Sequence, residues 1–394
     1  LVQPQFGQAQ FAQPQFAQPP EAASPFAQQP QLMQGQQFAQ SMIGNTVAPP
    51  DPLLNEISRQ LQEVREEAAP RVTPTFGIRT RSGEAGLERL MELSAGAEGS
   101  VAVPGIGGRL TARMSAVNAD IGQIGSGLPE LRRFGSNPAN LPGTTGTATQ
   151  QQIQTATNTE TSASGIALGL AYSRPNFTVD IGSTPLGFNR ANIVGGIEIA
   201  PEIADGVRVR ITAERRALMD SLLAWGGLRD PGTGREWGGV TRSGARVQLE
   251  FGGPETSFYV AGGYYQFEGE RVADNSRIEL GAGFSTSVWR GTTDEVTAGL
   301  DLVYFAYDKN LRYTTLGHGG YYSPQSFIAA TVPVDYRGRS GNFTYRLGAS
   351  LGMVSFTEDR APVFPNDPAL QAGLVQRVAS GEQGVDAFFA SQSK

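Results

Sequence analysis

The hydrophobic pattern of this chain alternates with a period of two residues, most clearly between Asp294 and Phe356. Apolar side chains occupy every second position of three successive segments: Val296, Ala298, Leu300, Leu302 and Tyr304; Ile328, Ala330, Val332, Val334 and Tyr336; Phe343, Tyr345, Leu347, Ala349, Leu351 and Met353. Such a period places successive side chains on opposite faces of a strand. Five or six apolar positions in register are about enough to cross a bilayer in a tilted strand. The pattern predicts the hairpins of a transmembrane β-barrel.

The same pattern predicts about thirteen strands between residues 71 and 357, joined by two kinds of connection. Short turns are expected near 104–108, 174–176, 204–206, 252–256, 290–294 and 338–342. Longer connections are expected near 121–163, 184–192, 219–240, 268–275 and 308–325. Bacterial outer-membrane barrels have short periplasmic turns and long extracellular loops. We therefore expect the first strand to start in the periplasm and the long loops to face the cell exterior.

The expected fold is an all-β, antiparallel up-and-down transmembrane barrel with an odd number of strands in this sequence. Thirteen strands leave residues 358–394 as one more extracellular loop, whereas barrels of this kind close with an even number. We expect about 13 of 16 strands to be present, so that the barrel domain, 71–394, is truncated at its C-terminus.

The first 70 residues have a different pattern. Residues 1–50 are a low-complexity Gln/Pro/Phe segment with repeats of Phe-Ala-Gln-Pro. This composition predicts a disordered linker; the alternative is that its regular Phe residues bind a partner. Residues 51–70 predict an amphipathic helix that starts at Asp51-Pro52. A single amphipathic helix is not stable alone, so we expect it to end a helical repeat region upstream or to plug the barrel mouth.

Composition narrows the class of protein. Charged residues make up 17% and the chain contains 50 Gly and no Cys. The mean hydropathy of -0.25 is typical of a soluble protein, but lumen-facing residues dilute the hydropathy of barrel strands in the same way. The absence of Cys excludes disulfides and thiolate chemistry. A net charge of -6 and a pI near 5.1 argue against a nucleic-acid partner.

The sequence offers little catalytic chemistry. Its single histidine, His318, has Ser323 and Asp308 nearby in the sequence, but no nucleophile-elbow motif surrounds them. We interpret His318 as a loop residue among turn glycines. One His and no Cys leave only carboxylates as metal ligands, and no EF-hand spacing is present. We therefore predict no catalytic residue, no metal and no cofactor.

Charged side chains gather on the predicted lumen face of the strands. The candidates for residues that line a path through the lumen are Arg208, Arg210, Arg246, Glu250, Asp301, Asp335 and Arg346. One interpretation is a solvated wall whose opposite charges pair across strands. The other is a hydrated path for a neutral polymer, without a net field that would trap ions. Few aromatic residues point inward on the clearest strands, so a sugar-stacking surface is not predicted.

One loop is distinctive enough to suggest a family. The segment Leu316-Gly-His-Gly-Gly-Tyr-Tyr-Ser-Pro-Gln-Ser-Phe327, with 304–313 before it and 332–334 after it, resembles the C-terminal domain of cellulose synthase operon protein C. Residues 77–83 and 86–90 resemble the first hairpin of that domain, so that the resemblance covers about 71–394.

The resemblance implies a fold, a place and partners. It implies periplasmic tetratricopeptide repeats followed by a porin of about sixteen strands in the bacterial outer membrane, with the N-terminal part in the periplasm. The implied partners are the cellulose chain, outer-membrane lipid, and periplasmic and inner-membrane cellulose synthase components reached through the upstream repeats. This sequence contains neither the repeats nor the last strands, so scaffold binding and barrel closure are not carried over.

The implied function is the export of cellulose, a β-1,4-glucan, and three alternatives stay open. They are a porin for another polymer, such as poly-N-acetylglucosamine or alginate, a non-transport outer-membrane barrel with hydrolase activity, and a soluble β-sandwich adhesin. We expect the loop with His318, Tyr321 and Tyr322 to fold over or into the extracellular mouth and to shape the exit. Its two tyrosines then either contact glucose rings or belong to the outer aromatic girdle.

Overall fold

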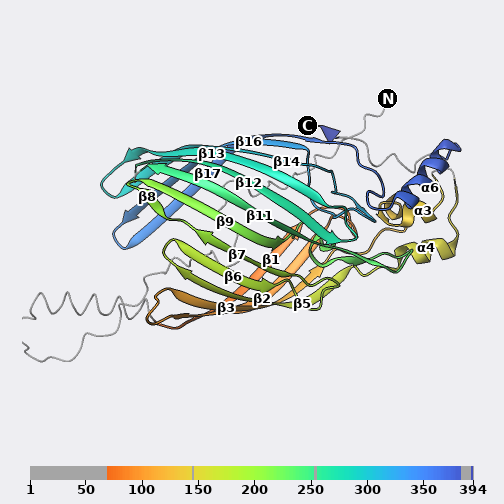
Figure 1. Cartoon of the computed structure of the whole chain (residues 1–394), viewed down its shortest axis with the longest axis horizontal. Helices are drawn as coiled ribbons and strands as arrows, with labels where there is room; N and C mark the ends of the chain where they lie inside the picture. The colour runs from red at the N-terminus through yellow and green to blue at the C-terminus, as the bar shows by residue number, and fades with distance from the viewer. Residues whose placement is uncertain (1–68, 144–145, 253–254, 383–391, 394) are drawn as a thin grey trace, which may run out of the picture.

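The computed structural model describes residues 69–143, 146–252, 255–382 and 392–393. The predicted linker and all but the last two residues of the predicted helix lie outside this part of the chain. One large antiparallel sheet dominates the structure (Figure 1). Its long strands are β1 (Arg71–Arg81), β2 (Leu90–Ala102), β3 (Arg109–Asp120), β5 (Ser162–Arg174), β6 (Phe177–Ser183), β7 (Ile193–Ile199), β9 (Val207–Ala217), β11 (Glu236–Gly252), β12 (Thr256–Glu270), β13 (Asn275–Arg290), β14 (Asp294–Tyr307), β16 (Ser326–Ser340) and β17 (Phe343–Glu358).

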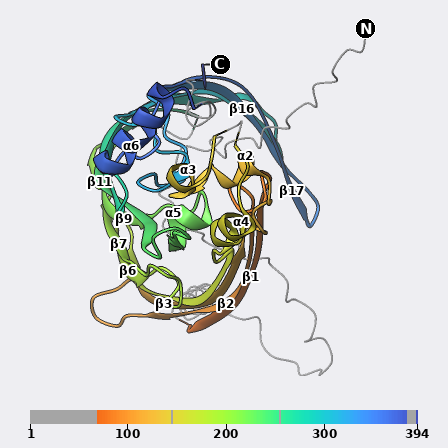
Figure 2. The ribbon, with the colours of Figure 1, turned by 90° about the vertical axis from the view of Figure 1, so that its right-hand side faces the viewer.

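These strands pair in chain order, from β1 next to β2 through to β16 next to β17. The thirteen segments agree with the strand count expected from the sequence. The short strands β8 (Glu202–Ala204), β10 (Leu228–Arg229) and β18 (Gln392–Ser393) add to this sheet beside β9, β11 and β17. The sheet curls into a barrel wall (Figure 2), and within the described residues its unjoined ends are β1 and the short β18 beside β17.

The wall follows the predicted alternation. Outward-facing apolar side chains are well exposed, as for Leu302 at 43% and Ile328 at 53%. Inward-facing neighbours are covered, as for Ala329 at 5%. In the turn between β16 and β17, Gly341 has a φ of +59°, a conformation that costs a residue with a Cβ about 1 kcal/mol or more. Alternation and turn chemistry together fix which face of each strand meets the lumen.

Short turns and long connections lie at opposite ends of the barrel, as the sequence predicts. Tight turns lie at the left end in Figure 1, and the long connections with all helices lie at the right. The connection between β3 and β5, expected as a polar loop, contains α2 (Leu128–Leu131), β4 (Phe134–Gly135), α3 (Asn137–Asn140) and α4 (Gln150–Thr157). Further along the chain lie α5 (Leu222–Gly226), β15 (Thr314–Thr315) and α6 (Pro368–Ala379). No helix in the described ranges is long and apolar enough to cross a membrane.

The apolar core of the molecule lies among these long connections. Its buried side chains come from the loop ends of the strands and from the loops themselves, which fill the opening of the ring in Figure 2. We call this set the mouth core. Its largest fully buried members are Trp237, Tyr321, Phe134, Phe267, Phe327, Phe364, Leu90, Ile121, Leu131, Leu141, Leu222 and Leu223. The structure therefore has two regions, a polar lumen wall and an apolar mouth.

Candidate channel lumen and its mouth

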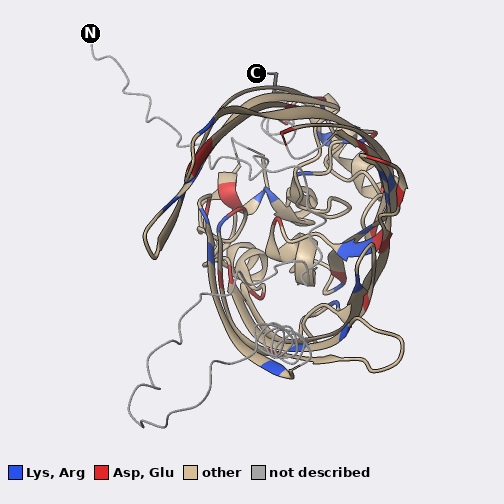
Figure 3. Cartoon of the chain, turned by 90° about the vertical axis from the view of Figure 1, so that its left-hand side faces the viewer, with Lys and Arg blue, Asp and Glu red and all other residues tan. Residues whose placement is uncertain are grey.

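The seven predicted path residues lie on β9 and β11 and, beyond β12 and β13, on β14, β16 and β17, at positions that alternate with the exposed apolar side chains. Figure 3 shows acidic and basic residues interspersed along the wall of the ring. Most of the seven are paired with an opposite charge. The structure thus brings them together as members of local pairs spread over the wall, and does not gather them into one site.

One cluster of opposite charges in the lumen wall is centred on Arg210. Its guanidinium lies between two carboxylates, 2.5 Å from Glu198 on β7 and 3.0 Å from Glu250 on β11. Arg246 lies 3.7 Å from Glu279 on β13. These side chains are partly exposed to the lumen, where solvent screening limits the stability that each pair adds to about 1 kcal/mol or less. Their main consequence is electrical, because positive and negative side chains lie next to one another along the wall, with two carboxylates at Arg210 and one at Arg246.

Asp301, Asp335 and Arg346 complete the predicted set. Arg346 donates to Asp335 over 2.7 Å. The hydroxyl of Tyr259 on β12 donates to the carboxylate of Asp301. The ring of Tyr259 lies across Gly283, where a Cβ would come within 2.5 Å of it. A glycine is therefore needed beneath this ring, and the tyrosine presents its edge and hydroxyl at the mid-height of the wall.

A second and more buried network lies closer to the mouth. Arg216 on β9 forms two hydrogen bonds with Asp180 on β6, of 2.6 and 2.7 Å. It also lies 3.2 Å from Glu214, which accepts a 2.7 Å hydrogen bond from Arg242. Such bidentate, charge-assisted contacts are stronger than exposed pairs. None of its four members is among the path residues predicted from the sequence.

The network continues onto an aromatic surface. The ring of Tyr265 lies between the guanidinium groups of Arg242 and Arg277, 5.2 and 5.1 Å from its centroid. Arg277 also lies within 5.7 Å of the rings of Phe267, Phe305 and Tyr307. Cation–π contacts of this kind favour burial of the guanidinium beside aromatic faces.

The expectation that few aromatic residues point inward is therefore wrong for β12, β14 and β16. The inward set is Tyr259, Tyr265, Phe267, Phe305, Tyr307 and Phe327. Near the loop end these strands are apolar on both faces, because the inward face packs on the mouth core. The sequence signal is the presence of Phe305 and Tyr307 beside the outward Tyr304, which breaks the apolar–polar alternation.

Tyr321 is part of the mouth core. It is 1% exposed, stacks on Phe267 with ring centroids 5.6 Å apart, and accepts a 3.1 Å hydrogen bond from the Asn275 amide. Burial raises the pKa of its hydroxyl. Tyr322 is half-buried, edge-on to Phe327 and Phe356. In this conformation the loop lies in the mouth, but Tyr321 presents no face to a sugar and neither ring lies in an outer girdle.

His318 is fully buried in the same loop. Its Nε2 lies 2.9 Å from the carbonyl oxygen of Pro362, and its ring meets Tyr313 edge-on. Burial lowers the pKa of the imidazole to about 4, so it is neutral at pH 7. Ser323 accepts from the Leu311 N–H over 2.7 Å and donates to the Tyr321 carbonyl.

The described contacts therefore commit Ser323 to the backbone, not to a relay with His318. Among the described residues, no group of His, Asp and Glu is arranged to hold a metal ion.

Asp230 ties two mouth loops together. Its fully buried carboxylate accepts four hydrogen bonds of 2.6–2.8 Å from the N–H and hydroxyl groups of Ser136 and Thr233. Nearby, β15 pairs in parallel with β4, which joins the loop 308–325 to the loop 121–161. These interactions hold segments together that are far apart in the sequence.

Hydrogen bonds also join β1 to a mouth loop from another part of the ring. Arg79 and Arg81 on β1 donate to the carbonyl oxygens of Met219 and Asp220, in the loop that follows β9. The Arg79 guanidinium lies 5.6 Å from the Trp225 ring of α5. Figure 2 shows α5 in the middle of the ring. The loops thus span the opening in this conformation.

Taken together, the up-and-down antiparallel wall, its apolar outward face and its charge-paired inward face define an outer-membrane β-barrel domain. Comparison with known families makes this more specific. The family model for the C-terminus of cellulose synthase operon protein C matches residues 88–394. The chain belongs to this family.

Curated relatives agree. Cellulose synthase operon protein C from Komagataeibacter xylinus is 34% identical over 349 residues, which are 88% of this chain and 26% of that protein. The protein of the same name from Xanthomonas axonopodis pv. citri is 34% identical over 238 residues, 58% of this chain and 16% of that protein. This chain therefore spans about a quarter or less of the length of these relatives.

Solved structures with a similar arrangement are outer-membrane proteins. A bacterial polysaccharide outer membrane secretin aligns with a TM-score of 0.42 and 12% identity, over 73% of this chain and 82% of that one. OmpT of Vibrio cholerae, in its trimer form, aligns with a TM-score of 0.34 and 12% identity, over 76% of this chain and 93% of that one.

Proposed function

We propose that this domain is the outer-membrane channel through which cellulose leaves the periplasm, and that it acts without catalysis. The observation that carries the proposal is the charge pairing of the lumen wall, in which Arg210 lies between Glu198 and Glu250. A neutral β-1,4-glucan gains nothing from a net field, and a strong field would retain counter-ions. A wall of small residues and interspersed charges of opposite sign suits a polymer that must slide without being held.

The lumen also offers the hydrogen-bonding groups that a hydrated glucan needs. Arg–carboxylate pairs and the hydroxyl of Tyr259 leave polar atoms along the wall that water and sugar hydroxyls can reach in turn. The path residues are accordingly Arg208, Arg210, Arg246, Glu250, Asp301, Asp335 and Arg346, as the sequence suggested, together with Tyr259. Water-mediated contacts of this kind are nearly as favourable as direct ones.

The mouth core implies a closed exit. Loops tied by Asp230 and by the β1 arginines fill the opening, so passage of a polymer requires them to separate. We infer that the described conformation is the closed state and that the loop containing His318, Tyr321 and Tyr322 moves with the exit. In its open state this loop would then line the outlet.

The location and partners follow from the same proposal. Short turns would face the periplasm and long loops the exterior. A longer protein carrying this domain would connect, through its upstream part, to periplasmic and inner-membrane cellulose synthase components.

The test uses the full-length protein in planar bilayers. Cellohexaose added on the turn side should block the open conductance, whereas an oligomer of alginate at the same concentration should block less. Stronger block by a poly-N-acetylglucosamine oligomer than by cellohexaose would favour that polymer as the cargo. Tighter block by the anionic oligomer than by cellohexaose would contradict the proposal.

A further inference from the structure

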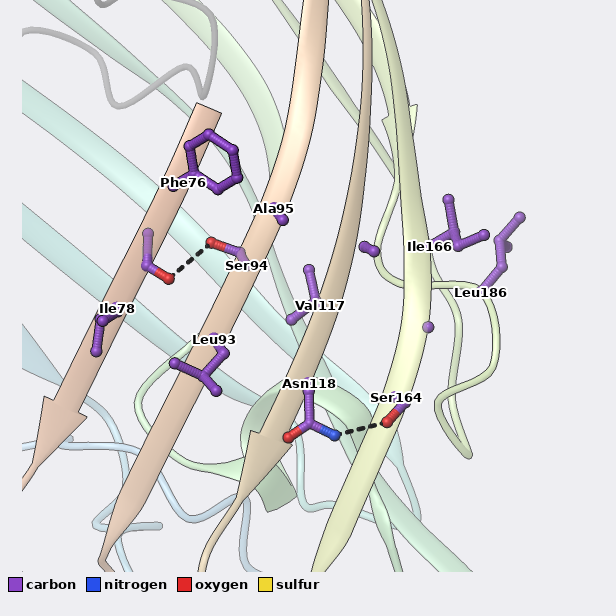
Figure 4. A pocket seen from close by; sticks show the side chains of 13 residues that line it. Phe76, Ile78, Leu93, Ser94, Ala95, Val117, Asn118, Ser164, Ile166 and Leu186 are labelled. Atoms are coloured by element: carbon purple, nitrogen blue, oxygen red, sulfur yellow. Dashed lines mark hydrogen bonds between the residues drawn. The ribbon is translucent and has the colours of Figure 1, made fainter. Parts of the chain in front are cut away.

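A groove on the outer face of the barrel is separate from the lumen and the mouth. It has a volume of about 940 Å³ and crosses β1, β2, β3 and β5. Figure 4 views it with the opposite wall behind these strands. The size lies at the upper end of the range of ~300–1,000 Å³ for small-molecule sites.

The floor and sides of the groove follow from the strand register. Ala95 pairs with Ala116, and this row continues to Phe76 on one side and Ile166 on the other. Two small side chains therefore lie between two large ones. Phe76 is 84% and Ile166 46% exposed, so both stand out from the wall as sides of a trough. Leu186, from the connection after β6, extends the second side.

One polar pair interrupts the apolar lining. The amide nitrogen of Asn118 donates to the hydroxyl of Ser164 over 2.7 Å, in the next row toward the loop end. An amide has a second N–H and an acceptor oxygen. Within the described residues, no other hydrogen bond reaches the Asn118 amide. A polar pair at the lipid-facing surface is costly unless a partner or water satisfies it.

The distance of this pair from the end of β3 can be compared with the thickness of the headgroup layer. Asn118 lies two residues from the end of β3, which is roughly 7 Å along the strand. The polar headgroup layer is about 5–8 Å thick on each side of the hydrocarbon. A strand that ends at the aqueous boundary would place the pair where headgroups are linked to acyl chains, with the apolar trough continuing below it into the hydrocarbon.

We propose that the groove holds one acyl chain of an outer-leaflet lipid, with Asn118 and Ser164 binding the carbonyl or hydroxyl at the head of that chain. The groove is continuous with the membrane-facing apolar surface, so lipid surrounds it. A chain seated on Ala95 and Ala116 fills the trough between Phe76 and Ile166. This site would fix a lipid next to β1, at one end of the described sheet.

The experiment uses the full-length protein in nanodiscs of phosphatidylethanolamine and phosphatidylglycerol. A trace of phosphatidylcholine with a diazirine in one acyl chain serves as the probe. After irradiation and digestion, labelling should be about tenfold higher on β1–β3 peptides than on the outer face of β13 and β14. Even labelling of all outer faces would mean ordinary annular lipid and would overturn the proposal.

Matched variants locate the site. Ala116→Leu fills the trough and should lower the β1–β3 labelling by about tenfold. Ala112→Leu makes the same change on the same face of β3, outside the groove lining, and should leave labelling unchanged. Asn118→Leu should lower it by about threefold through the lost hydrogen bonds.

Heat-modifiable migration on gels confirms that each variant is folded. If Ala116→Leu does not fold, Ala95→Leu tests the same trough. Unchanged labelling in a folded trough variant, or cross-links between two copies through these residues, would contradict a lipid site.

Discussion

The lumen wall and the mouth core are built on the same strands, yet they differ in what surrounds the inward side chains. At mid-height, Arg210 meets carboxylates and keeps contact with the lumen. Nearer the mouth, Phe267 of β12 and Tyr307 of β14 contact Tyr321 and are buried. Paired charged side chains keep their contact with water in the lumen, whereas aromatic side chains pack against the loops that reach them. The comparison suggests that the barrel stays open in the middle and is shut only at the exit.

The largest effect should come from the buried carboxylate of the mouth. Asp230→Ala leaves the four donors of Ser136 and Thr233 without their acceptor, which should destabilise the mouth core by about 3 kcal/mol or more. Hydrogen exchange of the loops 121–161 and 218–235 should accelerate, and the channel conductance should rise. Asp205→Ala, in an exposed turn at the other end of the barrel, is the control. If the two variants changed loop exchange and conductance equally, the buried carboxylate of the mouth would matter no more than an exposed one in a turn.

Acid should loosen the mouth at His318. The pKa of His318 is lowered from 6.5 to about 4 by burial, so the unfolded loop binds a proton at a pH where the folded loop does not. Stability contributed by the neutral imidazole is present above pH 6.5 and is lost as pH falls towards 4, by up to about 3 kcal/mol. Exchange of the loop 308–325 should accelerate over this window. His318→Asn should abolish most of the pH dependence; an unchanged profile in that variant would exclude His318 as its source.

The lumen pair should control ion selectivity more than stability. Arg210→Gln leaves Glu198 and Glu250 uncompensated, which should make the open channel more cation-selective while costing roughly 1 kcal/mol of stability. Reversal potentials in a salt gradient measure the shift. Arg210→Lys keeps the charge and should keep the selectivity. If the Gln variant conducts like the wild type, the pairs do not set the lumen field.

The smallest expected effect concerns Tyr321. Tyr321→Phe keeps the stack on Phe267 and removes the hydrogen bond from Asn275, a loss of about 1 kcal/mol. Export should persist with slightly faster loop exchange. Tyr321→Ala also removes the ring and should resemble Asp230→Ala instead. Abolished export in the Phe variant, with normal loop exchange, would point to a direct role of the hydroxyl.

The sequence predicts which side chains of the wall face the lumen, but it does not predict the contacts of the mouth core, for a physical reason. Leu302 and Ile328 are outward and Asp301 inward because side chains alternate along any strand. The same rule places Arg210 and Glu250 on one face, but the register sets Glu250 opposite Arg208, so that Arg210 contacts it diagonally. Asp230 and Ser136 are 94 residues apart in the sequence and lie in loops without periodicity. Their contact is set by how the loops pack. Phe305 and Tyr307 were visible as a break in alternation, but only the packed loops give that break a meaning.

The central claim is that a polymer leaves through a mouth that must open, and a cross-link tests it directly. This sequence has no Cys. A Cβ at Gly320 would lie 2.8 Å from the Ser221 hydroxyl, close to the Cβ–sulfur separation in a disulfide. Ser221→Cys with Gly320→Cys in the full-length protein therefore joins the loops after β9 and β14. We predict that oxidation stops cellulose secretion by the double variant and that reduction restores it, whereas each single variant secretes equally with and without the oxidant. Equal secretion by the oxidised and reduced double variant would show that these loops do not part for export.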